Sequence, residues 1–166
     1  MLMRNSAFWK RGALLVLAGV FAAGCTGPGI FETKNVAARK GLNKDVAARK
    51  GLMKSIGKTW KAVKKAAKAG DNKAAGKAAG ELYKLSGKIS KVFKNKGGKS
   101  RSKPNVWTDK GKFKQRAEFL AVSAAVFSQV HSKSGSKAMV SKGVKNIGKN
   151  CGGGHKTFRA KKKKKM

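Results

Sequence analysis

Apolar side chains recur every three or four residues in four successive stretches of this chain, and this spacing constrains the fold more than any other feature. An α-helix turns once in about 3.6 residues, so residues at that spacing share one face. The positions on this spacing are Val46, Leu52, Met53, Ile56, Trp60 and Val63; Ala75, Ala78, Leu82, Leu85, Ile89 and Val92; Phe113, Ala117, Leu120, Ala124 and Phe127; and Val140, Val144, Ile147, Cys151 and Phe158, with His155 on the same stripe of the last stretch. The pattern predicts four amphipathic helices and no strand.

Polar and turn-forming residues separate these stretches. The first helix is expected from about Asp45 to Ala69, and Asp71 can cap the second. A polar loop over residues 94–105 leads to the third helix, which Thr108 or Asp109 can cap. We therefore predict an all-α fold, an antiparallel four-helix bundle with short connections.

The charge of the chain is extreme, with 41 Lys and Arg residues against 6 Asp and Glu, a formal net charge of +35 in 166 residues. Such a charge implies an acidic partner: nucleic acid, anionic lipid or an acidic protein. Yet 40% of the residues are hydrophobic, which is too many for a disordered basic tail. The few acidic residues are better interpreted as helix caps and surface charges than as a catalytic pair, so we do not expect an enzyme.

Residues 1–24 have the layout of an export signal. Three basic residues within the first eleven positions precede a short apolar segment, Gly12–Ala23, which is too short to span a membrane comfortably. Cleavage after it would release the protein into the periplasm. The residues up to Cys25 also resemble a lipobox, so a lipid anchor on Cys25 is the alternative, and membrane association is expected only in that case.

A ten-residue segment is duplicated, since Asn35–Lys44 is followed directly by its near copy Asp45–Lys54. Ten residues advance a helix by about 1000°, so the copies cannot share one face, and two short copies are too few for a solenoid. We interpret the duplication as a lengthening of the first helix. The expected organisation is an N-terminal extension over residues 25–44, the bundle over 45–160 and a lysine-rich tail over 161–166.

Near the C-terminus, Cys151-Gly152-Gly153-Gly154-His155 contains part of a haem-attachment motif. In Cys-x-x-Cys-His the two thiols add to the porphyrin and the histidine ligates iron. Here Gly154 stands at the second cysteine position. Cys151 and His155 are one helical turn apart, so both are expected to face the core from the last helix.

Four stretches together resemble the cytochrome c-prime family, the class II c-type cytochromes, which are four-helix bundles with haem near the C-terminus. They are Arg49–Lys58, Lys103–Asp109, Lys112–Ala117 and Val144–Arg159. The resemblance covers roughly residues 45–160. It implies a haem site on the C-terminal helix, and it leaves a homodimer open, because many relatives dimerise.

Carried over by position, the resemblance implies roles for four residues. Cys151 would form a thioether to haem c, His155 would be the proximal iron ligand, and Arg159 matches a basic residue beside that histidine in relatives. Met53 stands where the low-spin branch of the family has a methionine as sixth ligand. In the high-spin branch an apolar residue there leaves the iron open to gases such as nitric oxide, whereas the alternative for Met53 is ordinary core packing.

The departure at Gly154 leaves three forms of the site open: haem held by a single thioether through Cys151, haem held by axial ligands alone, or a bundle without haem. The resemblance favours a periplasmic electron carrier that docks an acidic redox partner on its lysines. A high-spin gas binder is one alternative. A degenerate basic helical protein that binds nucleic acid or anionic surfaces is the other, although no specific nucleic-acid site is expected. Because of its glycines, the last helix is expected to depend on the cofactor for order.

Overall fold

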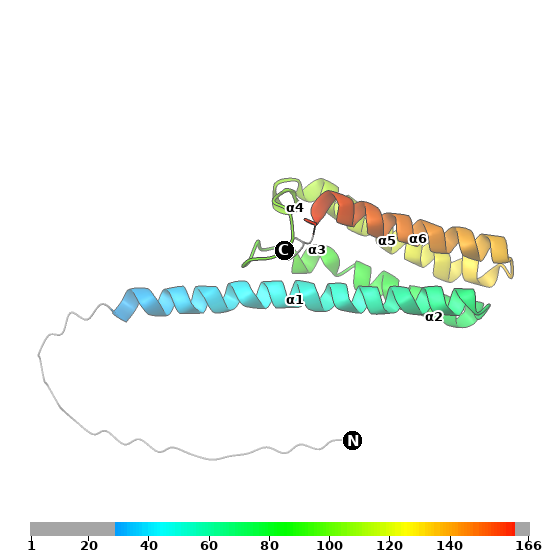
Figure 1. Cartoon of the computed structure of the whole chain (residues 1–166), viewed down its shortest axis with the longest axis horizontal. Helices are drawn as coiled ribbons and strands as arrows, with labels where there is room; N and C mark the ends of the chain where they lie inside the picture. The colour runs from blue at the N-terminus through cyan, green and yellow to red at the C-terminus, as the bar shows by residue number, and fades with distance from the viewer. Residues whose placement is uncertain (1–28, 162–166) are drawn as a thin grey trace, which may run out of the picture.

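The computed structural model describes the backbone of residues 29–161, and it describes side chains from residue 41 onward except residue 42. The expected export signal, Cys25 and nearly all of the lysine-rich tail lie outside the described residues. Four long helices make up the bundle, and three short helical segments connect them (Figure 1). The long helices are α1 (Gly29–Lys68), α2 (Asn72–Ser86), α5 (Lys110–Gln129) and α6 (Lys137–Phe158); the short ones are α3 (Ile89–Val92), α4 (Asn105–Thr108) and the 3-10 helix η1 (His131–Lys133).

The four long helices pack in a ring. α1 contacts α2 and α6, and α5 contacts the same two helices. This arrangement confirms the predicted all-α, antiparallel four-helix bundle. Within the described residues no helix is both long and apolar enough to cross a membrane.

The first helix is longer than the expected Asp45–Ala69 span. α1 begins at Gly29 and contains both copies of the duplicated segment in one continuous helix, as the lengthening interpretation predicts. With 40 residues it is about 60 Å long. Its N-terminal part projects beyond the rest of the bundle (Figure 1).

The second helix is shorter than the apolar spacing suggested, because α2 ends at Ser86 and the apolar positions Ile89 and Val92 fall in the separate helix α3. The hydroxyl of Ser86 donates to the backbone oxygen of Leu82 at 2.7 Å, a bond that bends helices. Gly87 follows it and lowers helix propensity further. The short helix α4 begins at the last residue of the polar loop and was not predicted from the sequence.

The expected caps are present. Asp71 accepts a hydrogen bond from the backbone N–H of Ala74 at 2.9 Å, and Asp109 accepts one from that of Lys112 at 3.1 Å. Each satisfies a donor that a helix start leaves without a partner. Of the two candidates for the third helix, Asp109 is the cap, since Thr108 ends α4.

Glycines bring the helices close together at the end of the bundle that holds η1. A Cβ built on Gly143 of α6 would lie 2.6 Å from the Phe127 ring and 2.9 Å from His131. Gly76 of α2 lies equally close to Ser132, and its backbone oxygen accepts a hydrogen bond from Ser128 at 2.8 Å. We call this region, formed by Gly76, Phe127, η1, Val140 and Gly143, the closed end of the bundle.

Candidate functional site

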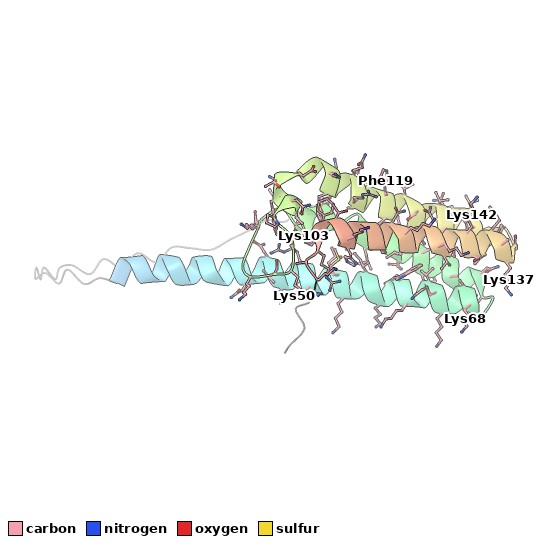
Figure 2. The ribbon with its side chains drawn as sticks, turned by 45° about the horizontal axis from the view of Figure 1, so that its top comes forward. Lys50, Lys68, Lys103, Phe119, Lys137 and Lys142 are labelled. Carbon is pink, nitrogen blue, oxygen red and sulfur yellow. The ribbon has the colours of Figure 1, made fainter. Side chains whose placement is uncertain are left out.

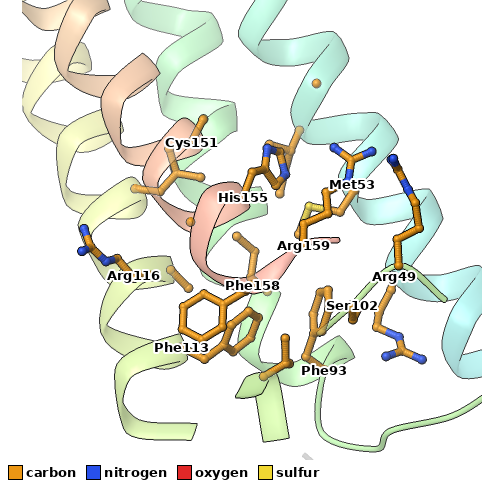
Figure 3. Close-up of a pocket in the computed structure, with 18 of the residues that line it drawn as sticks. Arg49, Met53, Phe93, Ser102, Phe113, Arg116, Cys151, His155, Phe158 and Arg159 are labelled. Atoms are coloured by element: carbon orange, nitrogen blue, oxygen red, sulfur yellow. The ribbon is translucent and has the colours of Figure 1, made fainter. Parts of the chain in front are cut away.

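The opposite end of the bundle contains a cavity of about 730 Å³ between α1, α5, α6 and the loop around residues 100–102 (Figure 3). Its volume lies in the range of small-molecule and cofactor sites. We call this region the open end. Three aromatic rings form one part of its wall: Phe113 lies 4.9 Å from Phe93 and 5.1 Å from Phe158 between ring centroids, the second pair edge to face.

All four residues that the sequence analysis singled out line this cavity. Cys151, His155 and Arg159 come from the C-terminal part of α6, and Met53 comes from α1 on the other side (Figure 3). Met53 and Cys151 are half-buried and pack against the hydrophobic core. Residues nearly a hundred positions apart in the sequence therefore meet at one cavity.

The thiol of Cys151 is partly enclosed. Burial raises its pKa, because the thiolate would lose solvation, and a hydrogen bond from its own backbone only partly offsets this. The thiol is therefore protonated at neutral pH and a weak nucleophile. A reaction partner would have to be held against it.

The imidazole of His155 lies at the rim of the cavity. The residue as a whole is exposed, but enough protein surrounds the ring to lower its pKa, and the positive charge of Arg101 lowers it further. The neutral imidazole is the form that ligates a metal. His155 therefore keeps a lone pair available at neutral and mildly acidic pH.

Arg49, which the sequence analysis did not single out, is the most unusual residue of the cavity wall. It is only 4% exposed, and its guanidinium lies 5.3 Å from the centroid of the Phe93 ring and 5.4 Å from that of Trp107. Its Nε donates to the backbone oxygen of Asp45 at 3.1 Å and its Nη2 to that of Lys96 at 2.8 Å. Burial lowers its pKa, while Asp45 acts in the opposite direction.

The Nη1 nitrogen of Arg49 is buried and has no hydrogen-bond partner. A buried charged donor without a partner is costly, so its presence beside a cavity indicates an anionic ligand. A signal for this role existed in the sequence. Arg49 precedes Met53 by four residues and so lies on the same face of α1.

The charged residues around the cavity share one sign. Those that line it are Arg49, Lys50, Lys54, Arg101, Arg116 and Arg159, and none of its lining residues is acidic. A positive rim around an apolar interior suits a large apolar ligand that carries carboxylates.

There is open space at position 154, where the haem-attachment motif has its second cysteine. A Cβ built on Gly154 would meet no atom within 4 Å, and the same holds at Gly152. A larger residue is therefore sterically allowed at position 154. The cavity does not require glycine there.

The last turn of α6 is tied to the loop after α3. Ser102 and Arg159 form an isolated antiparallel bridge, with hydrogen bonds from Lys103 N to Phe158 O at 2.9 Å and from Ala160 N to Arg101 O at 2.8 Å. α6 therefore continues through three successive glycines to Phe158 with its end held from outside. The prediction that this helix depends on a cofactor for order remains a prediction.

The residues fit a haem. Its porphyrin would supply four nitrogen ligands to iron, so a single histidine and a thioether sulfur are a sufficient protein donor set. The cavity offers His155 and Met53 as such donors and Cys151 as an attachment point. The free Nη1 of Arg49 and the other basic residues suit the two carboxylates of the porphyrin.

Comparisons with known proteins agree with this fit. The family model for Cytochrome C' matches residues 44–159. Among solved structures, cytochrome c' from Rubrivivax gelatinosus is 25% identical, covers 68% of this chain and 91% of its own, and has a TM-score of 0.58. Two variants of cytochrome c prime from Alcaligenes xylosoxidans with nitric oxide bound are 18% and 16% identical, cover 73% and 72% of this chain and 97% of their own, and have TM-scores of 0.65 and 0.63.

The comparison with curated proteins finds no match. The similarities with the Alcaligenes proteins bear on the fold, whereas the family match bears on the whole bundle, including the C-terminal motif.

Proposed function

Since the chain belongs to the cytochrome c' family, whose members bind haem c, we propose that it holds one haem in the cavity at the open end, attached through Cys151 and ligated by His155. The observation that carries the proposal is the meeting of Cys151, His155 and Met53 at one cavity lined otherwise by apolar and basic residues. When bound, haem supplies a one-electron couple at its iron.

Each of the site residues would have a separate role in binding haem. Cys151 would hold the porphyrin by a single thioether, because Gly154 offers no second thiol. His155, neutral at physiological pH, donates to iron from the α6 side. Arg49 and Arg159 would donate hydrogen bonds to the carboxylates, and the apolar wall around Phe113 would exclude water from the ring.

We propose that Met53 would supply a second iron ligand and that the function is electron transfer. Met53 is half-buried, packs against the core and faces the same cavity from α1 (Figure 3). Thioether sulfur is a soft ligand, and a Met/His pair raises the reduction potential of haem. With both axial positions filled, no substrate can reach the iron without displacing a ligand. This favours an electron carrier over an enzyme.

The second candidate is a gas-binding protein. It is favoured by the two Alcaligenes structures with nitric oxide bound, which share this fold. In that case Met53 is a packing residue and the iron is five-coordinate. The two candidates differ in the role of this one side chain.

The proposed location is the periplasm, with an acidic redox partner docking on lysines. The export signal and the family support this location. Association with such a partner should weaken as salt shortens the Debye length to about 8 Å near 0.15 M. A lipid anchor on Cys25 would add a membrane attachment.

The test is the absorption spectrum of protein purified after export. A six-coordinate low-spin spectrum is expected, and Met53→Ala should convert it to high spin and lower the potential. Met139→Ala, at an exposed methionine outside the cavity, is the matched control and should change nothing. A low-spin spectrum that survives Met53→Ala would remove Met53 as a ligand, and ready binding of nitric oxide or carbon monoxide would favour the gas binder.

Attachment is tested separately. Haem should stay with the chain in acidified organic solvent, and Cys151→Ser should release it. Gly154→Cys should raise the yield of holoprotein, because its side chain meets open space and restores the second thiol. Haem that extracts completely from the unmodified protein would exclude the thioether. Protein without haem under conditions that load a related cytochrome would reject the proposal.

A further inference from the structure

Trp60 of α1 lies between the cavity of the open end and the surface of the bundle. Its side chain lines the cavity and packs against the hydrophobic core. It also reaches α6, where a Cβ built on Gly148 would lie 3.5 Å from the six-membered part of the indole. The Nζ atom of the exposed Lys64 lies 5.6 Å from the centroid of the ring. One half-buried aromatic side chain therefore connects the cavity with the surface at the seam between α1 and α6.

Exposed lysines surround Trp60 on both helices. Three of them follow Trp60 along α1 at helical spacing, and two lie on either side of Gly148 in the sequence of α6. They are Lys61, Lys64, Lys68, Lys145 and Lys149, and all are exposed. We call these five lysines and Trp60 the Trp60 patch. The patch is part of a longer row of exposed lysines on α1, which runs from Lys50 to Lys68 over about 27 Å (Figure 2).

The positive charge of the Trp60 patch is not neutralised by neighbouring residues. The sequence contains no Asp or Glu over residues 46–70 or over residues 119–166. Among the described side chains, the two ion pairs lie within α2 and within α5. The lysines of α1 and α6 therefore repel one another, and an acidic partner that docks between them would remove this repulsion.

The composition of the patch favours a protein over a membrane or a nucleic acid. A helix that lies on a membrane presents large apolar side chains, whereas the exposed residues of α1 between positions 50 and 68 are Lys, Ala, Gly and Ser only. A nucleic-acid duplex binds lysines through its phosphates and does not need an indole among them. Tryptophan within a rim of polar residues is, in contrast, typical of the binding centre of a protein–protein interface.

We propose that the Trp60 patch is the docking surface for an acidic electron-transfer protein, and that the electron enters the cavity through Trp60. This inference rests on the proposed function, because it requires haem in the cavity. One electron leaves the reduced centre of the partner, which is oxidised, and ferric haem iron is reduced to the ferrous state. No bond forms or breaks, and no proton moves. The complex is short-lived, since exposed charges accelerate association more than they strengthen binding.

Docking is tested with the haem-free protein, so that the result does not depend on the proposed function. The probe is plant-type ferredoxin, an acidic iron–sulfur protein of low reduction potential, titrated in a calorimeter at low and high salt. Lys145→Glu combined with Lys149→Glu should weaken binding by about 10-fold or more, because two attractive charges become repulsive. High salt should weaken binding of the unmodified protein.

The matched control is Lys73→Glu combined with Lys77→Glu. These lysines are exposed and have the same spacing of four residues, but they lie on α2, the helix diagonal to α6 in the ring. The control makes the same change in net charge and should weaken ferredoxin binding much less. Circular dichroism of both double variants verifies that the bundle is intact.

Electron entry is tested with the haem-loaded protein and reduced ferredoxin. Trp60→Leu should slow the reduction of haem at saturating ferredoxin, because the aromatic contact between cavity and surface is lost. Trp60→Phe retains an aromatic ring and should restore most of the rate. The absorption spectrum and the reduction potential should be the same in both variants, which separates a change in the electron path from a change in the haem site.

Three results would overturn the proposal. The first is an equal loss of ferredoxin binding in the α6 double variant and its α2 control, and the second is an unchanged reduction rate in both Trp60 variants. The third is binding of phosphatidylglycerol vesicles or duplex DNA that depends on the Trp60 patch, with no binding of ferredoxin. A haem-free chain that binds ferredoxin at the patch but cannot be loaded with haem would support the docking surface and reject the proposed function.

Discussion

Glycine has opposite consequences at the two ends of the bundle. At the closed end, Gly143 lies so close to Phe127 that no further atom fits between them. At the open end, a Cβ built on Gly152 or Gly154 would meet no atom within 4 Å, and Gly154 lines the cavity of about 730 Å³. The closed end gains stability from close packing, whereas the open end keeps volume for a ligand at the expense of packing.

The difference indicates that the closed end contributes most to the stability of the fold, whereas the open end contains the candidate functional site. The fully buried side chains Phe127, Leu82 and Val63 belong to one continuous hydrophobic core and do not line the cavity. Of the residues proposed to hold haem, Met53 and Cys151 are half-buried and His155 and Arg159 are exposed, whereas Arg49 is buried. The bundle should therefore fold without the cofactor, and loss of the cofactor should affect mainly the open end.

The largest expected effect is at the closed end. Phe127→Ala should lower the free energy of unfolding by about 3–5 kcal/mol, because a fully buried ring is removed and a void is left. Phe119→Ala on the same helix is the control and should cost far less, since its side chain is 45% exposed. Urea unfolding at low protein concentration measures both. Equal losses would mean that the closed end is not the stabilising one.

A smaller loss of stability is expected when a single methyl group is added at the closed end. Gly143→Ala should destabilise the protein by about 1–3 kcal/mol, because its Cβ would lie 2.6 Å from the Phe127 ring and one of the two helices must move. The shift of the urea midpoint reports it. A stabilised variant would show that the helices separate easily and that the contact is not tight.

A Gly→Ala substitution at the open end should instead stabilise the protein. Gly152→Ala meets no atom within 4 Å, so only the better helix propensity of alanine remains, and a gain of about 0.5–1 kcal/mol is expected. Thermal unfolding of the haem-free protein measures it. A loss of stability would place a neighbour where the structure has open space.

The smallest expected effect is a pH dependence at the open end. His155 has a lowered pKa, so the folded state binds its proton less readily than the unfolded state. Stability of the haem-free protein should therefore be complete above about pH 6.5 and fall as the pH drops below that value. His155→Gln should remove this component from unfolding midpoints measured between pH 5 and 8. An unchanged profile would assign the pH dependence to other groups.

The sequence predicted the local features of the fold well. Helix spacing and the caps at Asp71 and Asp109 depend on residues within one turn of each other, and the structure contains them. The break after Ser86 was missed, because apolar spacing continues across it to Val92 and does not register a change of helix direction.

The candidate site could be predicted only in part. Cys151, His155, Arg159 and Met53 were found through a motif and a resemblance, and all four line one cavity. Arg49 was missed because its burial depends on Lys96, 47 residues away, and on the rings of Phe93 and Trp107, which are also far from it in the sequence. The volume of the cavity could not be predicted from the sequence either, because a void depends on how all four helices pack together.

The bridge between Ser102 and Arg159 determines which part of the open end can move first. The three glycines of α6 are the weakest part of that helix, yet they lie between the packed core and a last turn fastened to the loop. A segment fixed at both ends can bend only after one fastening is released. We therefore expect the three glycines to move only after the loop detaches, at the rate of that detachment. Amide exchange at Lys103 and Ala160 would measure it directly, because their N–H groups make the fastening bonds.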